Sequence, residues 1–173
     1  MKKVYVSWHD IQRQVQEICR QMLHDKWSPD YVIGITRGGL TPANLISQYL
    51  DCPMEALKVS LSDGTEPEHN LWMAEDAYEG KNILIVDDIN DSGATLNWIK
   101  NDWEDFHPSK REPWLTIWGN NVKIATLYDN EVSESKMPVN YCAETINKAN
   151  DPQWIVFPWE EWWRRWNPQE EHK

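Results

Sequence analysis

The sequence predicts an α/β domain: a mostly parallel central sheet flanked by helices. Short apolar segments alternate along the chain with segments whose apolar residues recur at helical spacing, which is typical of strands joined by helices. Residues 83–86 are continuously apolar within the predicted strand 83–87, as expected of a strand that helices cover on both faces. The length of 173 residues suits one domain, so we assign residues 1–173 to a single unit.

Three helices are expected from capping residues and apolar spacing. Ser7 and Asp10 have the spacing of a capping box at the start of the first helix. The second helix is expected to begin at Thr41 and Pro42, a cap and first-turn pair. The third follows residue 95. Their apolar residues at helical spacing are, in order, Ile11, Val15, Ile18 and Met22; Leu45, Ile46 and Tyr49; and Leu96, Ile99, Trp103 and Phe106.

Apolar segments also predict five strands of the sheet. The third is the most apolar and is expected to be central. Between the second and third strands, residues 61–80 are polar with little regular pattern, and loops of this length are usually functional or disordered. The predicted strands are residues 31–35, 56–60, 83–87, 122–128 and 139–143.

Several of the 12 tryptophans lie near the C-terminus. Trp159, Trp162, Trp163 and Trp166 recur at helical spacing, which predicts an aromatic stripe on one face of a C-terminal helix. Most such stripes belong to a core. A subunit interface is the alternative, and a homo-oligomer is the assembly that we expect.

Composition argues against some kinds of partner. A formal net charge of −11 disfavours binding to nucleic acid, because the phosphates would be repelled. We find no signal peptide and no apolar segment long enough to span a membrane, so no membrane partner is expected. The three cysteines lie far apart without metal spacing, which suits a reducing compartment, and we expect a cytoplasmic protein.

The segment with the clearest chemistry is VDDINDSGAT, residues 86–95. Residues 91–95 run into a predicted helix start, where free N–H groups, the helix dipole and two hydroxyls form a cradle for a phosphate. Asp87 and Asp88 only accept hydrogen bonds, so they suit neighbouring hydroxyls or Mg²⁺. A sugar phosphate satisfies both demands. TRGGL, residues 36–40, follows another strand, and both loops are expected at the same edge of the sheet.

Competing motifs fail on spacing. Asp88, Asn90, Ser92 and Gly93 fall at positions 1, 3, 5 and 6 of a calcium loop, but its twelfth position is Ile99 where a bidentate Glu is required. The chain contains no GxGxxG and no GxxxxGK[ST], so the fingerprints of dinucleotide and P-loop sites are absent.

VDDINDSGAT resembles the phosphoribosyl pyrophosphate (PRPP) signature of the type I phosphoribosyltransferases. Three further segments resemble the bacterial xanthine-guanine phosphoribosyltransferases. ITRGGL, residues 35–40, is similar to their pyrophosphate loop, VYVSWHDI to their N-terminal strand and helix, and DPQWIVFPWE, residues 151–160, to their purine site. The matches follow the same order and span most of the chain, whereas residues 100–121 look like an insertion.

The resemblance implies a role for each matching residue. Asp91 would be catalytic, as a general base or acid on the purine. Asp87 and Asp88 would hold the ribose hydroxyls, with Asp88 also near the implied cofactor, Mg²⁺. Trp154 would stack on the base, and the backbone at Ile155 would read its edge. The other PRPP-binding residues would be Arg37, Gly38 and Gly39 at the pyrophosphate, and Ser92, Gly93, Ala94 and Thr95 at the 5-phosphate.

Two longer segments also receive roles from the resemblance. Residues 61–80 would form a mobile hood that covers the reacting centre and excludes water. Residues 151–166 would form the base-recognition segment and the C-terminal helix.

The function implied is purine salvage, in which phosphoribosyl passes from PRPP to a purine base and gives a nucleoside monophosphate and pyrophosphate. Asn130 stands where the family has a lysine that donates to the 6-oxo group, so hypoxanthine or guanine is favoured over xanthine, and adenine is not excluded. A PRPP-binding regulator on the same fold is one alternative, and a phosphoribosyltransferase for another base is a second. Asp91 and Trp154 favour the enzyme.

Overall fold

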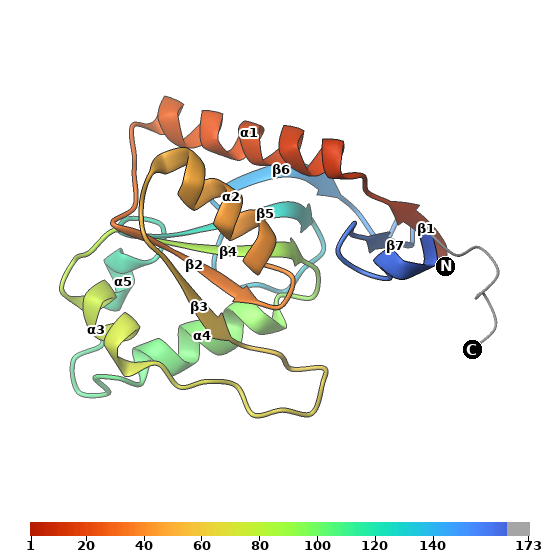
Figure 1. The fold of residues 1–173 in the computed structure, drawn as a ribbon. Coiled ribbons are helices and arrows are strands. Elements are labelled where there is room, and N and C mark those ends of the chain that lie inside the picture. The colour runs from red at the N-terminus through yellow and green to blue at the C-terminus, as the bar shows by residue number, and fades with distance from the viewer. Residues whose placement is uncertain (166–173) are drawn as a thin grey trace.

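The computed structural model describes residues 1–165 and shows an α/β fold built on a parallel sheet (Figure 1). The five-stranded sheet has the order β3-β2-β4-β5-β6, and a separate two-stranded sheet pairs β1 with β7. All of these pairings are parallel. The strands are β1 (Lys2–Tyr5), β2 (Tyr31–Thr36), β3 (Met54–Lys58), β4 (Ile83–Asn90), β5 (Val122–Asn130), β6 (Tyr141–Ile146) and β7 (Gln153–Val156).

Helices cover both faces of the larger sheet (Figure 1). Helices α1 and α2 pack on one face, and α3, α4 and α5 pack on the other. The predicted α/β class and the central position of β4 are therefore confirmed. The helices are α1 (Trp8–Asp25), α2 (Leu40–Leu50), α3 (Leu71–Tyr78), α4 (Ala94–Glu104), α5 (Trp114–Ile117) and the 3-10 helix η1 (Trp162–Arg165).

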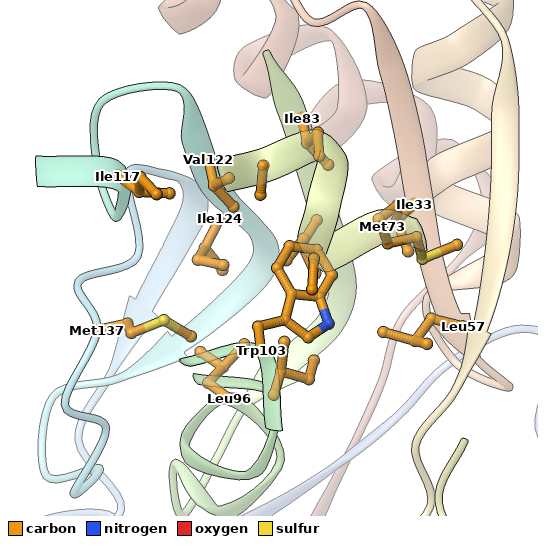
Figure 2. Packing of buried hydrophobic residues seen from close by; sticks show 14 of the residues in the cluster. Ile33, Leu57, Met73, Ile83, Leu96, Trp103, Ile117, Val122, Ile124 and Met137 are labelled. Carbon is orange, nitrogen blue, oxygen red and sulfur yellow. The ribbon is translucent and has the colours of Figure 1, made fainter. Parts of the chain in front are cut away.

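The alternation of side chains along β4 explains why its first four residues are all apolar. Ile83 and Ile85 face the core under α3, α4 and α5, where the buried Trp103 lies among aliphatic side chains (Figure 2). Leu84 and Val86 face the core under α1 and α2. Because successive side chains of a strand point to opposite faces, residues 83–86, which are buried on both sides, include no polar residue, and the polar residues of β4 begin at Asp87.

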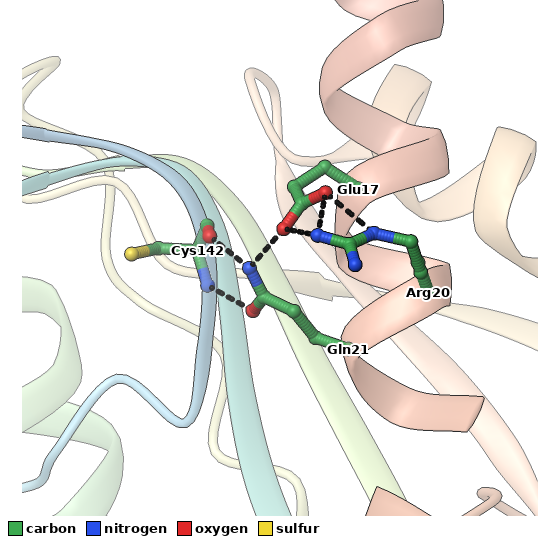
Figure 3. A network of polar contacts seen from close by, with 4 residues as sticks. All are labelled: Glu17, Arg20, Gln21 and Cys142. Carbon is green, nitrogen blue, oxygen red and sulfur yellow. Dashed lines mark hydrogen bonds and ion pairs between the residues drawn. The ribbon is translucent and has the colours of Figure 1, made fainter. Parts of the chain in front are cut away.

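A polar network fixes α1 against β6, an outer strand of the sheet (Figure 3). The Gln21 amide donates to the Cys142 carbonyl at 2.8 Å and accepts from the Cys142 N–H at 3.2 Å. Glu17 accepts from Gln21 at 3.0 Å and from the Arg20 guanidinium. The side chain of Gln21 thus satisfies backbone groups that an edge strand leaves unpaired.

The first two helices follow the predictions with one shift. The capping box of Ser7 and Asp10 is present at α1, as predicted. Helix α2 starts at Leu40 rather than at Thr41 and Pro42, because the Gly39 carbonyl already accepts the first helical bond, from Ala43 N–H at 3.0 Å. Tyr49 was expected to be buried but is 55% exposed.

The prediction that residues 61–80 lack regular structure is wrong in its second half, where α3 forms. The side chain of Asn70 caps this helix by accepting from Met73 N–H at 3.1 Å, and Met73, Ala74 and Ala77 are buried against the sheet. An N-cap and three buried apolar residues make too short a helical pattern to stand out in a polar segment.

The predicted C-terminal helix is wrong in its start: within residues 1–165 only Trp162–Arg165 are helical, as the 3-10 helix η1, and Trp159 lies before it. After β7 the chain forms a turn that two hydrogen bonds stabilise. The Glu160 N–H donates to the Phe157 carbonyl, and the Phe157 N–H donates to the Glu160 carboxylate. Trp159 stacks on Phe157 in this turn at 4.9 Å between ring centroids, while Trp162 and Trp163 are at least half exposed in η1. Trp166, the last member of the expected stripe, lies outside the described residues.

Candidate active site

Two loops meet at the carboxyl edge of the sheet, one after β2 and one after β4. An added Cβ at Gly39 would lie 2.3 Å from the Val86 carbonyl oxygen, and one at Gly38 would lie 2.0 Å from Asp88 Oδ2. A side chain at Gly39 would therefore displace the backbone of β4, and one at Gly38 would displace the Asp88 carboxylate. The sequence expectation that these loops converge agrees with the structure.

The acidic pair at the end of β4 is divided between two cavities. Asp88 lines a cavity of about 600 Å³, together with Arg37, Gly38 and Glu160. Asp87 lines a smaller cavity of about 80 Å³, whose wall includes the segment 91–95. Neighbouring strand residues point in opposite directions, so a ligand that contacts both carboxylates has to lie across the end of β4.

Both carboxyl groups lie in surroundings that disfavour their charge. Burial raises the pKa of Asp87 well above its usual value, and the neighbouring charge of Asp88 raises it further. Burial also raises the pKa of Asp88 to about 6, with a further contribution from the charge of Glu160. Charged carboxylates in this position gain from a cation or from hydroxyl donors on a ligand.

The donor set fits Mg²⁺ only if a substrate completes the coordination. Among residues 1–165, no group of three or more His, Cys, Asp or Glu side chains is arranged to hold a metal. Mg²⁺ is usually bound through one or two carboxylates together with substrate phosphates, and it needs no larger protein cluster. Asp88, which faces the larger cavity, is the carboxylate placed for this role.

The turn that precedes α4 is shaped by a glycine. Gly93 has φ of +87° and is the N-cap of α4, so the N-cap residue has no side chain that could accept from the first turn. An added Cβ would lie 2.3 Å from Ser135 N. Ser92 Oγ accepts from Ala94 N–H at 3.2 Å, while the next N–H groups of a helix start have no partner inside the helix. These groups lie at the smaller cavity and suit an anion.

Thr126 of β5 is a site residue that the sequence did not suggest. It is fully buried, lines the smaller cavity with Asp87, and its hydroxyl has no hydrogen-bond partner within residues 1–165. A buried hydroxyl of this kind is costly unless a ligand or water satisfies it. Only the register of β5 beside β4 brings it there, opposite Asp87.

A second group of polar residues surrounds Asp91. The Asn130 amide donates to the backbone carbonyl of Asp91 at 3.1 Å and to its carboxylate at 3.2 Å, and it accepts from Lys148 N–H at 3.1 Å. The Lys148 ammonium lies 2.7 Å from the other carboxylate oxygen of Asp91. Asn130 is only 4% exposed, and both ends of its amide are used inside the protein.

Trp154 and Ile155 lie on β7, beside this group. Trp154 is 50% exposed, and its ring centroid lies 5.7 Å from the Lys148 ammonium, whereas Ile155 is buried. Lys148 is therefore the residue that connects Trp154 to Asp91. No sequence motif marked it, because it lies in a polar segment between β6 and β7 whose position depends on the fold.

The family model for the phosphoribosyl transferase domain matches residues 3–165 of this chain. The chain belongs to the phosphoribosyltransferase family. This confirms the family resemblance, the fold class and the activity class, transfer of a glycosyl group.

Curated proteins and solved structures agree with this assignment. The chain is 28% identical over 163 residues to a xanthine-guanine phosphoribosyltransferase of Idiomarina loihiensis, with 92% of this chain and 88% of that protein covered. It is 30% identical over 169 residues to the enzyme of the same name from Cereibacter sphaeroides, covering 92% and 87%. A purine phosphoribosyltransferase from Pyrococcus horikoshii is similar in structure, with a TM-score of 0.65, 28% identity, and 93% and 96% coverage.

Within residues 1–165, none of the helices combines the length and the apolar character that crossing a membrane requires.

Proposed function

We propose that this chain is a cytoplasmic purine salvage enzyme that transfers 5-phosphoribosyl from PRPP to a 6-oxopurine. The products are a nucleoside monophosphate and pyrophosphate. The observation that carries this proposal is the division of Asp87 and Asp88 between two cavities, each of which is also lined by a loop suited to phosphate groups. The names of the relatives from Idiomarina loihiensis and Cereibacter sphaeroides support a purine as acceptor.

PRPP fits the site as a ligand with an anion at each end and hydroxyls between them. Its 5-phosphate would bind the N–H groups and hydroxyls of residues 92–95, at the smaller cavity. Its pyrophosphate would lie in the larger cavity, held by Arg37 and the N–H group of Gly38. The Gly39 N–H, which the sequence also assigned to the pyrophosphate, instead donates to the Ile35 carbonyl at 2.8 Å. Asp87 and Asp88 would accept hydrogen bonds from the ribose hydroxyls that lie across the end of β4.

The reaction breaks the bond between the anomeric carbon and the pyrophosphate oxygen and forms a bond from that carbon to a purine nitrogen. Negative charge develops on the leaving pyrophosphate, where Arg37 and backbone N–H groups stabilise it. The attacking nitrogen loses its proton, and Asp91 is the carboxylate at the base side that would take it. Mg²⁺, when bound at Asp88 with the pyrophosphate, neutralises part of the leaving group's charge.

The proposal is tested by incubating the chain with radiolabelled PRPP, Mg²⁺ and one free base at a time. Hypoxanthine, guanine, xanthine, adenine, nicotinate and uracil form a sufficient panel. We expect consumption of PRPP with at least one 6-oxopurine and release of pyrophosphate in equal amount. PRPP that binds in calorimetry but is consumed with no base would favour the alternative, a PRPP-binding regulator.

A homo-oligomer is part of the proposal. Trp162 and Trp163 are 57% and 50% exposed, and large aromatic side chains in solvent are typical of surfaces that bind a partner. Sedimentation of the full chain and of a chain that ends at residue 161 gives the test. We expect the truncated chain to have the smaller mass; equal masses would remove these tryptophans from the interface.

A further inference from the structure

We propose that Lys148 determines which base this enzyme accepts, by donating a hydrogen bond to the 6-oxo group of the purine. The inference rests on the proposed function and deepens it. A neutral amide, Asn130, stands where the family resemblance implies a cation for this contact. In the structure a cation from another segment, the turn between β6 and β7, contacts the same Asp91 carboxylate that Asn130 binds.

The ammonium of Lys148 lies close to both groups that a bound base would contact in the proposed function, Asp91 and Trp154. It is 2.7 Å from Asp91 Oδ2 and 5.7 Å from the ring centroid of Trp154, and its side chain is 16% exposed. An ammonium has three donors and no acceptor, so the contact with Asp91 leaves donors for a ligand. A base stacked on Trp154 with a nitrogen near Asp91 would present its adjacent edge to these donors.

The side chain of Lys148 is not required to hold its own turn in place. Asn147 Oδ1 accepts from Ala149 N–H and Asn150 N–H, both at 3.1 Å, and the Asn147 carbonyl accepts from Asp151 N–H at 3.0 Å. The backbone N–H of Lys148 is anchored on Asn130 at 3.1 Å. These bonds persist whatever side chain stands at position 148, so the ammonium is placed by the turn and does not build it.

Stability also gives no sufficient reason for the pair of Lys148 and Asp91. The carboxylate is 43% exposed, and ion pairs open to solvent contribute little to the free energy of folding. Asn130 already binds the carbonyl and the carboxylate of Asp91. The ion pair therefore adds little to the position of Asp91, but it does bring a positive charge to the base side of the site.

The chemistry of this group selects among purines. A 6-oxo group accepts a hydrogen bond from an ammonium, whereas the 6-amino group of adenine is itself a donor and leaves both groups unpaired. Xanthine, which is partly anionic near neutral pH, gains from the same charge. Lys148 therefore favours all three 6-oxopurines over adenine, and it removes the argument against xanthine that the neutral Asn130 supplied.

The experiment compares Lys148→Met, Lys148→Arg and the control Lys110→Met, which removes an ammonium from an exposed loop far along the chain from the site. For each, kcat/KM is measured with hypoxanthine, guanine, xanthine and adenine, along with PRPP affinity by calorimetry and Tm. We expect Lys148→Met to lower kcat/KM for its 6-oxopurine substrates by about 10²-fold, because a polar contact to the base is lost. In Lys148→Met, adenine turnover and PRPP affinity should stay within about twofold of wild type, and Tm within about a degree. Lys148→Arg should recover part of the lost kcat/KM. Lys110→Met should behave as wild type in every measurement.

Two results would overturn the inference alone. One is a wild-type enzyme that uses a 6-oxopurine while Lys148→Met keeps kcat/KM within twofold. The other is an equal loss with adenine and the 6-oxopurines, which would make Lys148 a structural residue. A wild-type chain that consumes PRPP with none of the bases would instead refute the proposed function, and this inference with it.

Discussion

The phosphate side and the base side of the candidate active site are built in different ways. On the phosphate side, backbone groups form the surface, and close approaches at Gly38, Gly39 and Gly93 leave no room for a side chain. On the base side, Lys148 and Trp154 come from segments outside the five-stranded sheet and meet Asp91 only through the fold. Backbone geometry limits the first region strongly, whereas side chains on a turn and a short strand define the second.

This difference between the two regions indicates which residues of the site can be substituted without loss of the fold. A change at a glycine that touches β4 disturbs the sheet itself, so we expect it to affect both stability and PRPP binding. A change at position 148 alters one side chain on a turn that its own backbone bonds maintain. Base preference is therefore free to change while the phosphate side is kept.

Asp91 belongs to both regions, and its replacement is expected to have the largest effect. It follows β4 on the phosphate turn, but its carboxylate is bound by Asn130 and Lys148 on the base side. Asp91→Asn removes the proton acceptor, so kcat should fall by about 10²- to 10⁴-fold. The PRPP dissociation constant, measured by calorimetry, should change by less than about threefold, since backbone groups hold the phosphate. An equal loss in both quantities would show that the two regions cannot be separated.

Gly93→Ala tests whether the close contact with Ser135, in addition to the positive φ, excludes a side chain at this position of the phosphate side. We expect the free energy of unfolding to fall by about 2–5 kcal/mol, because a left-handed φ and a clash with Ser135 add up. PRPP binding should be lost as well. Gly80→Ala is the matched control, with φ of +94° and no atom within 4 Å of the added Cβ. It should cost about 1–2 kcal/mol in urea unfolding and leave activity unchanged; similar losses in both variants would contradict the role of the contact.

Asp88→Asn is expected to stabilise the enzyme in the absence of substrate while it weakens PRPP binding. Folding raises the pKa of Asp88 to about 6. From about pH 4 to 6 the folded chain therefore binds more protons than the unfolded chain. As a result, the free energy of unfolding falls as the pH rises through this range. At pH 7.5 the variant should be about 1–3 kcal/mol more stable than wild type. Below about pH 4 the difference should vanish, because both side chains are then neutral. Urea unfolding at pH 3.5 and 7.5 checks this, and a gain that does not depend on pH would exclude the carboxylate charge as its cause.

Ser7→Ala has the smallest expected effect and serves as a reference for the scaffold. Loss of the capping box at α1 should lower the free energy of unfolding by about 1 kcal/mol. Neither PRPP affinity nor kcat/KM should change by more than about twofold, because α1 contributes to neither region. A marked rise in KM for the base alone would show that the base side depends on the start of α1.

The contrast between the two regions also explains what the sequence was able to predict. The strand β4 was predictable because burial on both faces requires a continuous apolar segment. The turn after it was predictable because the start of α4 needs small residues at neighbouring positions in the sequence. Helix α3 was missed because its signal is a single N-cap with three buried residues. Lys148 and Thr126 were missed because their importance depends on contacts between segments far apart in sequence. The C-terminal tryptophan spacing suggested a helix, although bonds between Phe157 and Glu160 form a turn there.

The pairing of β1 with β7 has a consequence for the order in which the molecule folds. Lys2 to Tyr5 pair with Gln153 to Val156, so the strand that carries Trp154 cannot dock until nearly the whole described chain has been synthesised. Contacts of such high sequence separation close slowly, whereas β2, β3 and β4 associate with near neighbours. On the ribosome, the nucleus around these early strands is expected to form first, and the platform for the purine is expected to be completed last.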